Sequence, residues 1–475
     1  MLLERLFSIV LTIYIARVLG ASTLGEYTLV LSFVVIFQIL ALFGQDEIIM
    51  REVSRDRSKA GLYLANSSLV AVLTSIVFLI VMNATVNLLG YEQNIVTYMY
   101  IASFSLLPGT VSLVAEAVIK AFEKMEYVTA VRFGGNLLNV IAALVLLQLG
   151  YELIAVFVLL IIVRSVMSVL YMFFITRVAG RLTFGLDLRF CRNLLGVSIT
   201  FLLISVLGMV INNIGVVMLS KLEDLEALGI YAAGAKLMQG GQVFAAAYTL
   251  SVVPSMSRAF VASKERFIKI AQRSLDLFLI LSIPIALGVT ILADTIIFLI
   301  YGSGYEASVP VLQILIWALV LQAVNSVLYR SLVASNNEHV TLRVGSVRMI
   351  GSVLLNFLLI TKYGVVGASL AWIGAMLIGL LLNYYYVSKQ LLKLDIIVTT
   401  AKIFLSAIIA SGGFLWLRSL EANRLGSLLL GGAIYVFVYS VLLITLRVLS
   451  RDELLLLLRQ LGQRVATGSQ PTLLE

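Results

Sequence analysis

The chain has 475 residues, of which 61% are hydrophobic and 12% are charged, whereas soluble domains carry about 25% charged residues. That composition excludes an ordinary soluble protein, because apolar runs of about twenty residues, the length of a membrane-spanning helix, recur along the chain. Cys191 and His339 are the single cysteine and histidine. Zinc sites, thiol pairs and disulfide frameworks are therefore excluded, and we expect no metal, no cofactor and no enzyme activity.

The apolar runs predict an all-α polytopic membrane protein with about fourteen transmembrane helices. Read in chain order, the predicted spans are 2–19, 27–43, 62–82, 95–119, 128–148, 152–175, 194–219, 230–253, 274–293, 308–333, 340–361, 365–388, 396–417 and 425–446. An even number of spans places both termini on the same side of the membrane.

The distribution of basic residues gives the orientation. With these spans, 26 of the 34 Lys and Arg residues lie on the side of the termini, five lie on the other side, and Arg132, Arg164 and Lys236 lie within spans. The positive-inside rule then predicts cytoplasmic termini in a multi-pass protein of the cytoplasmic (inner) membrane. The net charge of +9 follows this topology, so we expect no nucleic-acid partner.

An internal repeat predicts the domain organisation. Arg17 with the motif 24–27 (LGEY) recurs as Lys221 with 228–231 (LGIY) at a constant offset of 204, and Val131-Arg132 recurs as Val347-Arg348. We expect two six-helix bundles related as parallel repeats, a design common among alternating-access transporters. The predicted parts are an N-terminal bundle at 1–193, a C-terminal bundle at 194–394, two further transmembrane helices at 395–450 and a cytoplasmic tail at 451–475.

Several motifs resemble those of one known family. They are 16–20 (ARVLG) with 25–27 (GEY), 228–233 (LGIYAA) through Lys236 to 254–258 (PSMSR), 301–302 (YG) before Tyr305, 334–337 (ASNN), and 363–368 (YGVVGA). Because these motifs occur together and in this order, the chain resembles the polysaccharide transport branch of the multidrug/oligosaccharidyl-lipid/polysaccharide exporter superfamily, whose members flip lipid-linked oligosaccharides. One position departs from the family, since many relatives carry Asn-Ile-Asp-Arg where this chain has 213–216 (NIGV). If that acid and base bind a coupling cation in relatives, coupling here uses another residue or is absent.

The resemblance implies a flippase that moves a polyprenyl-(pyro)phosphate-linked oligosaccharide across the membrane by alternating access, with cation coupling left open. The implied partners are this substrate, the membrane lipids, and a polysaccharide polymerase or glycosyltransferases, for a chain that we expect to be monomeric. Two alternatives stay open: a drug/cation antiporter of the same fold, and a membrane polysaccharide polymerase or glycosyltransferase. The antiporter needs acids within the spans, and the enzyme needs acidic or histidine residues on sizeable aqueous loops.

The candidate substrate-binding residues are cations, because a charge in the hydrocarbon region is costly and tends to face a cavity or a partner, and because arginine matches phosphate oxygens. These cations are Arg164, Lys236, Arg132, Arg348, Arg17 and Lys221. For each of them a structural role, as an ion pair, a helix-end anchor or a snorkelling side chain, is the alternative.

Acids and amides complete the candidate residues. Glu116, one turn before Lys120, is the candidate for cation coupling, with an interfacial salt bridge as the alternative. Amide side chains within spans hydrogen-bond sugar hydroxyls or hold helices together. The amides predicted to line the cavity are Asn212, Asn213, Gln239 and Gln242.

Overall fold

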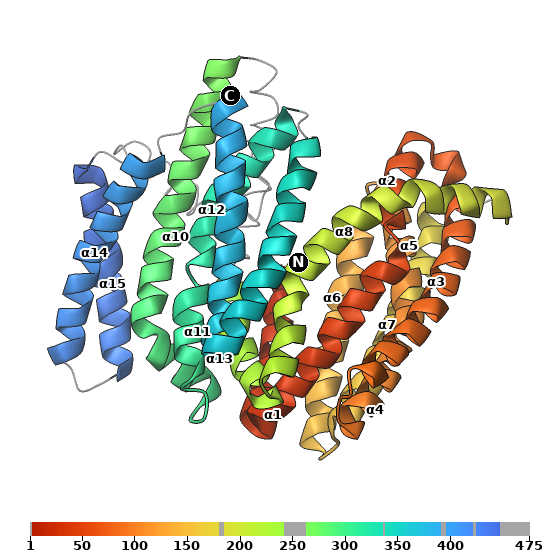
Figure 1. Cartoon of the computed structure of the whole chain (residues 1–475), viewed down its shortest axis with the longest axis horizontal. Helices are drawn as coiled ribbons and strands as arrows, with labels where there is room; N and C mark the ends of the chain where they lie inside the picture. The colour runs from red at the N-terminus through yellow and green to blue at the C-terminus, as the bar shows by residue number, and fades with distance from the viewer. Residues whose placement is uncertain are drawn as a thin grey trace. The chain divides into compact units, whose positions relative to one another are not determined.

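The computed structural model of the chain describes residues 2–179, 185–241, 263–335, 338–390, 396–420 and 424–446. Every regular element in these ranges is helical (Figure 1), which confirms the all-α prediction. The helices are α1 (Leu2–Leu42), α2 (Gln45–Arg55), the 3-10 helix η1 (Arg57–Lys59), α3 (Ala60–Leu88), α4 (Gln93–Ser103), α5 (Leu106–Ala121), α6 (Met125–Gln148), α7 (Leu153–Val178), α8 (Leu188–Leu222), a helix over 225–241, α10 (Lys264–Tyr301), α11 (Ser308–Leu315), α12 (Ala318–Ala334), α13 (Glu338–Gln390), α14 (Ile396–Leu420) and α15 (Arg424–Thr445).

Nine segments of the described chain are long and apolar enough to cross a membrane, and α14 and α15 contain shorter apolar stretches. Two of the nine, Phe7–Leu42 and Val340–Lys389, each cover two of the spans predicted from the sequence. The predicted span 230–253 lies only in part within the described residues, which end there at 241. Gln242, the 254–258 motif and the tail at 451–475 lie outside them. The protein is thus multi-pass, and the count of fourteen spans stays a prediction.

α1 and α13 each run through two predicted spans, and a single glycine lies at the join in each helix. Gly20 has φ +87° inside α1, and Gly364 has φ +54° inside α13, so the chain changes direction at both points without a loop. These positive φ values are the conformations that glycine adopts at little cost. The predicted span 95–119 shows the opposite result: it is divided into α4 and α5 at 104–105, just before Pro108, which sits in the first turn of α5, where proline is tolerated.

The chain divides into two compact units. The first comprises Met1–Phe244, Ala293–Ala318 and Glu338–Leu382, and the second comprises Ala245–Leu292, Leu319–Asn337 and Asn383–Glu475. In the second unit, the Tyr439 hydroxyl on α15 donates a 2.8 Å hydrogen bond to the Ile280 carbonyl on α10. The domain boundaries expected from the repeat stay a prediction.

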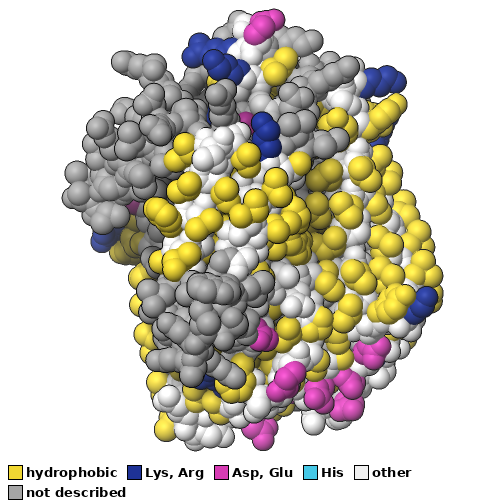
Figure 2. Space-filling model, turned by 90° about the vertical axis from the view of Figure 1, so that its left-hand side faces the viewer, with side chains coloured by type: hydrophobic (Ala, Val, Ile, Leu, Met, Phe, Trp, Pro, Cys, Tyr) yellow, Lys and Arg dark blue, Asp and Glu magenta, His cyan; other side chains and the backbone are white. Residues whose placement is uncertain are grey.

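The surfaces of the helices match a lipid environment. On α3, Leu73, Val77 and Ile80 are each more than half exposed and lie on one helical face by their i, i+4, i+7 spacing. The opposite side of α3 buries Ala71 and Ser75 completely. Figure 2 shows hydrophobic side chains over the middle of the face that it presents and acidic side chains toward its lower end. Apolar side chains face outward because the bilayer, rather than water, is the solvent of these helices.

Candidate functional site

Arg164 lies near the middle of α7 and faces the break between α4 and α5. Its Nη1 donates hydrogen bonds to the Ser105 hydroxyl at 3.2 Å and to the Ser105 carbonyl at 3.4 Å. In the described part of the chain, no carboxylate oxygen lies within 4.0 Å of this guanidinium. Arg164 therefore carries a positive charge in the membrane region with neutral partners only, as an anion-binding residue would.

Gly109 makes the room that Arg164 occupies. A Cβ at position 109 would lie 2.9 Å from Arg164 Nη1 and 2.7 Å from the Gln38 side-chain nitrogen. Both distances are shorter than a Cβ tolerates, so any larger residue would push the guanidinium or the amide away. The sequence does not indicate this role of Gly109, because nothing in it shows that Arg164 and Gln38 lie against this glycine.

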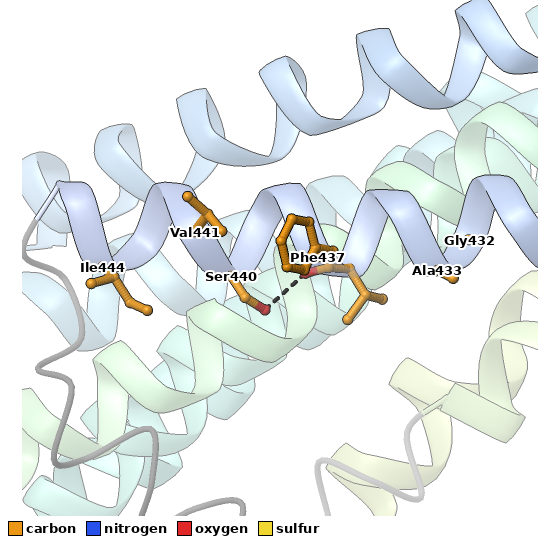
Figure 3. A pocket seen from close by; sticks show the side chains of 7 residues that line it. Gly432, Ala433, Phe437, Ser440, Val441 and Ile444 are labelled. Atoms are coloured by element: carbon orange, nitrogen blue, oxygen red, sulfur yellow. Dashed lines mark hydrogen bonds between the residues drawn. The ribbon is translucent and has the colours of Figure 1, made fainter.

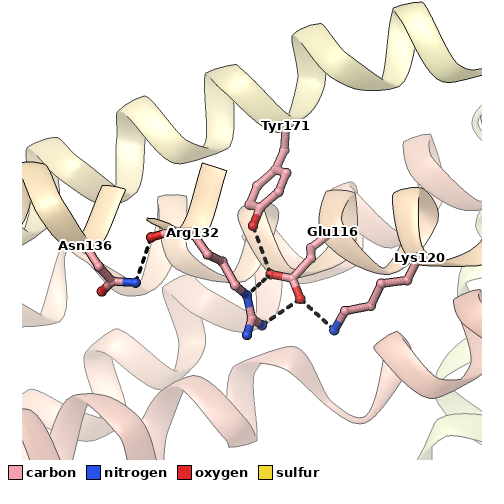
Figure 4. A network of polar contacts seen from close by, with 5 residues as sticks. All are labelled: Glu116, Lys120, Arg132, Asn136 and Tyr171. Carbon is pink, nitrogen blue, oxygen red and sulfur yellow. Dashed lines mark hydrogen bonds and ion pairs between the residues drawn. The ribbon is translucent and has the colours of Figure 1, made fainter. Parts of the chain in front are cut away.

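Glu116 on α5 is the centre of a buried polar network (Figure 4). Its side chain is 3% exposed, and its two oxygens accept hydrogen bonds from Arg132 Nε at 2.8 Å and Nη2 at 2.6 Å. Lys120 Nζ lies 2.6 Å from the same carboxylate, and the Tyr171 hydroxyl donates to it at 3.1 Å. Arg132 is therefore held by a bidentate ion pair, and Glu116 is saturated by donors from three helices.

One face of α5 links Arg164 to this network. Ser105, Gly109, Ser112 and Glu116 follow one another at spacings of four, three and four residues, which places them on one side of a helix. The Ser112 hydroxyl donates a 3.3 Å hydrogen bond to the Arg164 carbonyl, and Ser112 and Glu116 are both buried. A line of polar groups thus runs along α5 toward Lys120 inside an otherwise apolar bundle.

Arg348 on α13 differs from its predicted repeat partner, Arg132. Its Nε is buried and has no hydrogen-bond partner. No carboxylate of the described residues lies within 4.0 Å of it. Its side chain packs against Gly379, where a Cβ would lie 3.0 Å from Arg348 Cδ. The ion pair of the N-terminal half has no counterpart here, so this arginine has capacity for an anion.

Arg17 and Lys221, the paired cations of the repeat, bind backbone carbonyls. Arg17 Nε donates to the Ile300 carbonyl at 2.7 Å, and its Nη2 contacts the Leu299 carbonyl, both in the last turn of α10. Lys221 Nζ donates to the Leu89 carbonyl at 2.7 Å and lies 3.4 Å from the centre of the Tyr91 ring. Cations near the last carbonyls of a helix interact favourably with its dipole, so in this conformation both residues occupy anchoring positions.

The remaining candidates are dispersed. Lys236, on the helix at 225–241, donates a 2.6 Å hydrogen bond to the Ser8 hydroxyl of α1. Asn213 Nδ2 donates to the Met209 carbonyl of its own helix at 3.0 Å, while Asn212 and Gln239 are exposed. Gln242 lies outside the described residues. Of the candidate residues that the structure describes, Arg132 and Glu116 form an ion pair with each other. The hydrogen bonds of Arg164, Lys236, Asn213, Arg17 and Lys221 described here go to residues that were not candidates.

Two carboxylates outside the predicted spans, Asp46 and Glu306, have shifted pKa values. Asp46, in the first turn of α2, has its pKa raised by burial. Glu306, in the connection between α10 and α11, accepts hydrogen bonds from the Gly304 N–H at 3.0 and 3.2 Å, and such backbone donors lower the pKa of its carboxyl. Glu306 therefore stays charged at neutral pH at the end of the molecule where Arg17 contacts α10.

The fold and these intramembrane cations define a class, the multi-pass membrane transporters built from helical bundles. Comparison with known proteins gives the family. The family model described as "Polysaccharide biosynthesis protein" matches residues 1–260, more than half of the chain, and the model described as MatE matches residues 197–358. The chain belongs to the polysaccharide biosynthesis protein family, within the multidrug/oligosaccharidyl-lipid/polysaccharide exporter superfamily of transporters and flippases, and it is not an enzyme.

Three relatives illustrate the similarity. The probable low-salt glycan biosynthesis flippase Agl15 of Haloferax volcanii is 24% identical over 389 residues, which are 79% of each chain. The lipid II flippase MurJ in an inward closed conformation aligns with a TM-score of 0.76 and 14% identity, covering 94% of this chain and 97% of the other. An inward-facing multidrug resistance MATE family transporter aligns with a TM-score of 0.67 and 14% identity, covering 81% and 95%. At these identities, the two solved structures confirm the fold alone.

Proposed function

We propose that this transporter is a flippase for a polyprenyl-(pyro)phosphate-linked oligosaccharide, a precursor of a cell-surface polysaccharide. It carries the head group from the cytoplasmic to the outer leaflet of the cytoplasmic membrane by alternating access, with both termini in the cytoplasm. The observation that carries the proposal is the charge state of the membrane region. Arg164 and Arg348 have no carboxylate partner among the described residues, whereas Glu116 is fully engaged with cations and a hydroxyl.

This charge pattern suits an anionic substrate. A guanidinium forms two parallel hydrogen bonds to phosphate oxygens, and a charge inside the membrane costs about 3 kcal/mol on insertion scales. A phosphate that arrives with its own charge offsets part of that cost. The neutral partners of Arg164, the hydroxyl and carbonyl of Ser105, hold the guanidinium without neutralising it.

The second unit has an apolar pocket of its own. A pocket of about 700 Å³ on α15 is lined by Gly432, Ala433, Val436, Phe437, Ser440, Val441 and Ile444 (Figure 3). The Ser440 hydroxyl is turned inward to the Val436 carbonyl at 2.8 Å, so the lining presents almost only carbon atoms. An acyl or prenyl chain of a membrane lipid would leave no buried polar group unpaired there.

A drug/cation antiporter of the same fold is the second candidate, because the MatE model covers residues 197–358. That function needs a carboxylate available to an organic cation, and Glu116 does not offer one in this conformation. Coupling to a cation gradient stays an open part of the proposal, since Gly215 stands where many relatives have an acid. A polysaccharide polymerase or glycosyltransferases are the partners that would supply or consume this substrate.

Reconstitution of purified protein in liposomes tests the proposal. The liposomes contain a fluorescent polyprenyl-pyrophosphate oligosaccharide or, in a parallel set, the uncharged polyprenyl glycoside, and an external quencher reports the accessible fraction. We expect protein-dependent exchange of the charged lipid only. We expect Arg164→Ala and Lys236→Ala to lose transport while inserting normally, with Lys124→Ala, a surface lysine, as the matched control. Near-normal transport by both variants would contradict the assignment of these cations.

A further inference from the structure

The two copies of the repeated motif meet backbone to backbone in the first unit. A Cβ on Gly25 would lie 1.8 Å from the Leu225 carbonyl oxygen and 3.1 Å from the Gly229 nitrogen. A Cβ on Gly229 would lie 1.8 Å from the Ala21 carbonyl oxygen and 3.1 Å from the Gly25 nitrogen. Because 225 and 229 are 21 and 25 plus the repeat offset of 204, each copy makes the same contact with the other. We call the contact of Ala21 and Gly25 with Leu225 and Gly229 the glycine seam.

No side chain fits in the glycine seam. A distance of 1.8 Å to a backbone oxygen cannot be relieved by a side-chain rotation, so a methyl group at either glycine forces the two helices apart. Ala21 and Gly25, two small residues four apart on α1, form the pattern that lets membrane helices approach closely. On the other helix, Gly229 faces this pair, and Leu225 contributes its backbone carbonyl. The neighbouring Leu24 and Leu228 are completely buried, so the residues beside the seam are shielded from solvent on both copies of the repeat.

The surrounding contacts place the seam at the outer end of the unit. Tyr305 donates a 3.0 Å hydrogen bond to the Ala16 carbonyl, Tyr301 donates a 3.1 Å hydrogen bond to the Ala233 carbonyl, and Ser308 donates a 2.7 Å hydrogen bond to the Ile230 carbonyl. The end of α10 and the start of α11 therefore bind both copies of the repeat. Glu116 and Lys120, by contrast, belong to the end that the distribution of basic residues predicts to be cytoplasmic.

We propose that the glycine seam is the outer gate of this transporter: it is closed in this conformation, and the two copies separate when the substrate leaves toward the outer leaflet. The proposal rests on the proposed alternating-access function and adds the contact on which the closed state depends. A contact between backbones has no long side chains to reorder, so it opens and closes with few rotamer changes. The identical geometry on the two copies makes the closed state self-complementary, as at a two-fold interface.

The test replaces the seam glycines and measures access beneath them. Ala16, which is 2% exposed, becomes the reporter as Ala16→Cys in a Cys191→Ala chain, and a membrane-impermeant maleimide is added from outside. We expect Gly25→Ala and Gly229→Ala each to accelerate labelling about tenfold, because an added methyl group destabilises the closed state. Gly208→Ala is the matched control, because a Cβ there meets nothing within 4 Å, and it should leave the labelling rate unchanged.

A second reporter separates gate opening from general loosening. Ala115 on α5 is completely buried, and Ala115→Cys should stay protected in the Gly25→Ala and Gly229→Ala chains. Unchanged labelling at position 16, or equally accelerated labelling at positions 16 and 115, overturns the proposal. The maleimide reports the gate without any substrate, so failure of lipid-linked oligosaccharide transport alongside selective labelling at position 16 would count against the proposed function alone.

Discussion

Arg132→Met is the sharpest test of the buried network. The substitution removes the donors at 2.8 and 2.6 Å from a carboxylate that is 3% exposed, and leaves Glu116 with Lys120 and Tyr171. Removing one partner of a buried ion pair costs about 3–5 kcal/mol. Because the Lys120 and Tyr171 contacts remain, we expect a loss of about 3 kcal/mol in the free energy of unfolding, at the lower end of that range.

The assay is reversible unfolding by SDS in mixed micelles, followed by tryptophan fluorescence. Lys124→Met is the matched control: Lys124 lies 3.6 Å from Glu126, with both side chains more than half exposed, and exposed pairs of this kind contribute about 0–1 kcal/mol. The double variant Glu116→Gln/Arg132→Met should be more stable than Arg132→Met alone, because it leaves no carboxylate buried without its arginine. An Arg132→Met variant as stable as Lys124→Met would refute the reasoning.

Two further predictions concern the arginine in α7 and the orientation of the chain. Gly109→Ala should reduce transport strongly, because its Cβ would displace Arg164 or Gln38, whereas Gly134→Ala, where a Cβ meets nothing within 4 Å, should transport normally; equal transport by the two variants would show that the position of Arg164 is not important. In a Cys191→Ala chain, Glu92→Cys should react with an impermeant maleimide added outside and Ser58→Cys should not, because basic residues concentrate on the cytoplasmic side; the reverse pattern would invert the topology.

The sequence predicted the helical architecture well because apolar runs of spanning length leave few alternatives in a bilayer. It did not predict where helices join or divide. Gly20 joins two predicted spans into α1, and Gly364 joins two others into α13. Residues 104–105, by contrast, divide one predicted span into α4 and α5. These differences depend on the φ angles of single residues, which hydropathy does not report.

The candidate site was predictable only in its local part. Lys120 lies one turn from Glu116, so the sequence indicated that ion pair, and the structure contains it. Arg132 and Tyr171 reach the same carboxylate from other helices, 16 and 55 residues away, and no spacing rule relates them. Similarly, the repeat at an offset of 204 was visible in the sequence, but the contact between Gly25 and Gly229 was not, because a glycine in a sequence does not show what its missing side chain would meet.

Leaflet exchange in liposomes that also enclose a fluorescent organic cation tests most directly whether this chain moves an anionic lipid-linked oligosaccharide. We expect wild-type protein to render the inner-leaflet polyprenyl-pyrophosphate oligosaccharide accessible to an external quencher while the organic cation stays inside. Efflux of the cation under an imposed proton or sodium gradient, with no exchange of the charged lipid, would contradict this expectation and establish the antiporter.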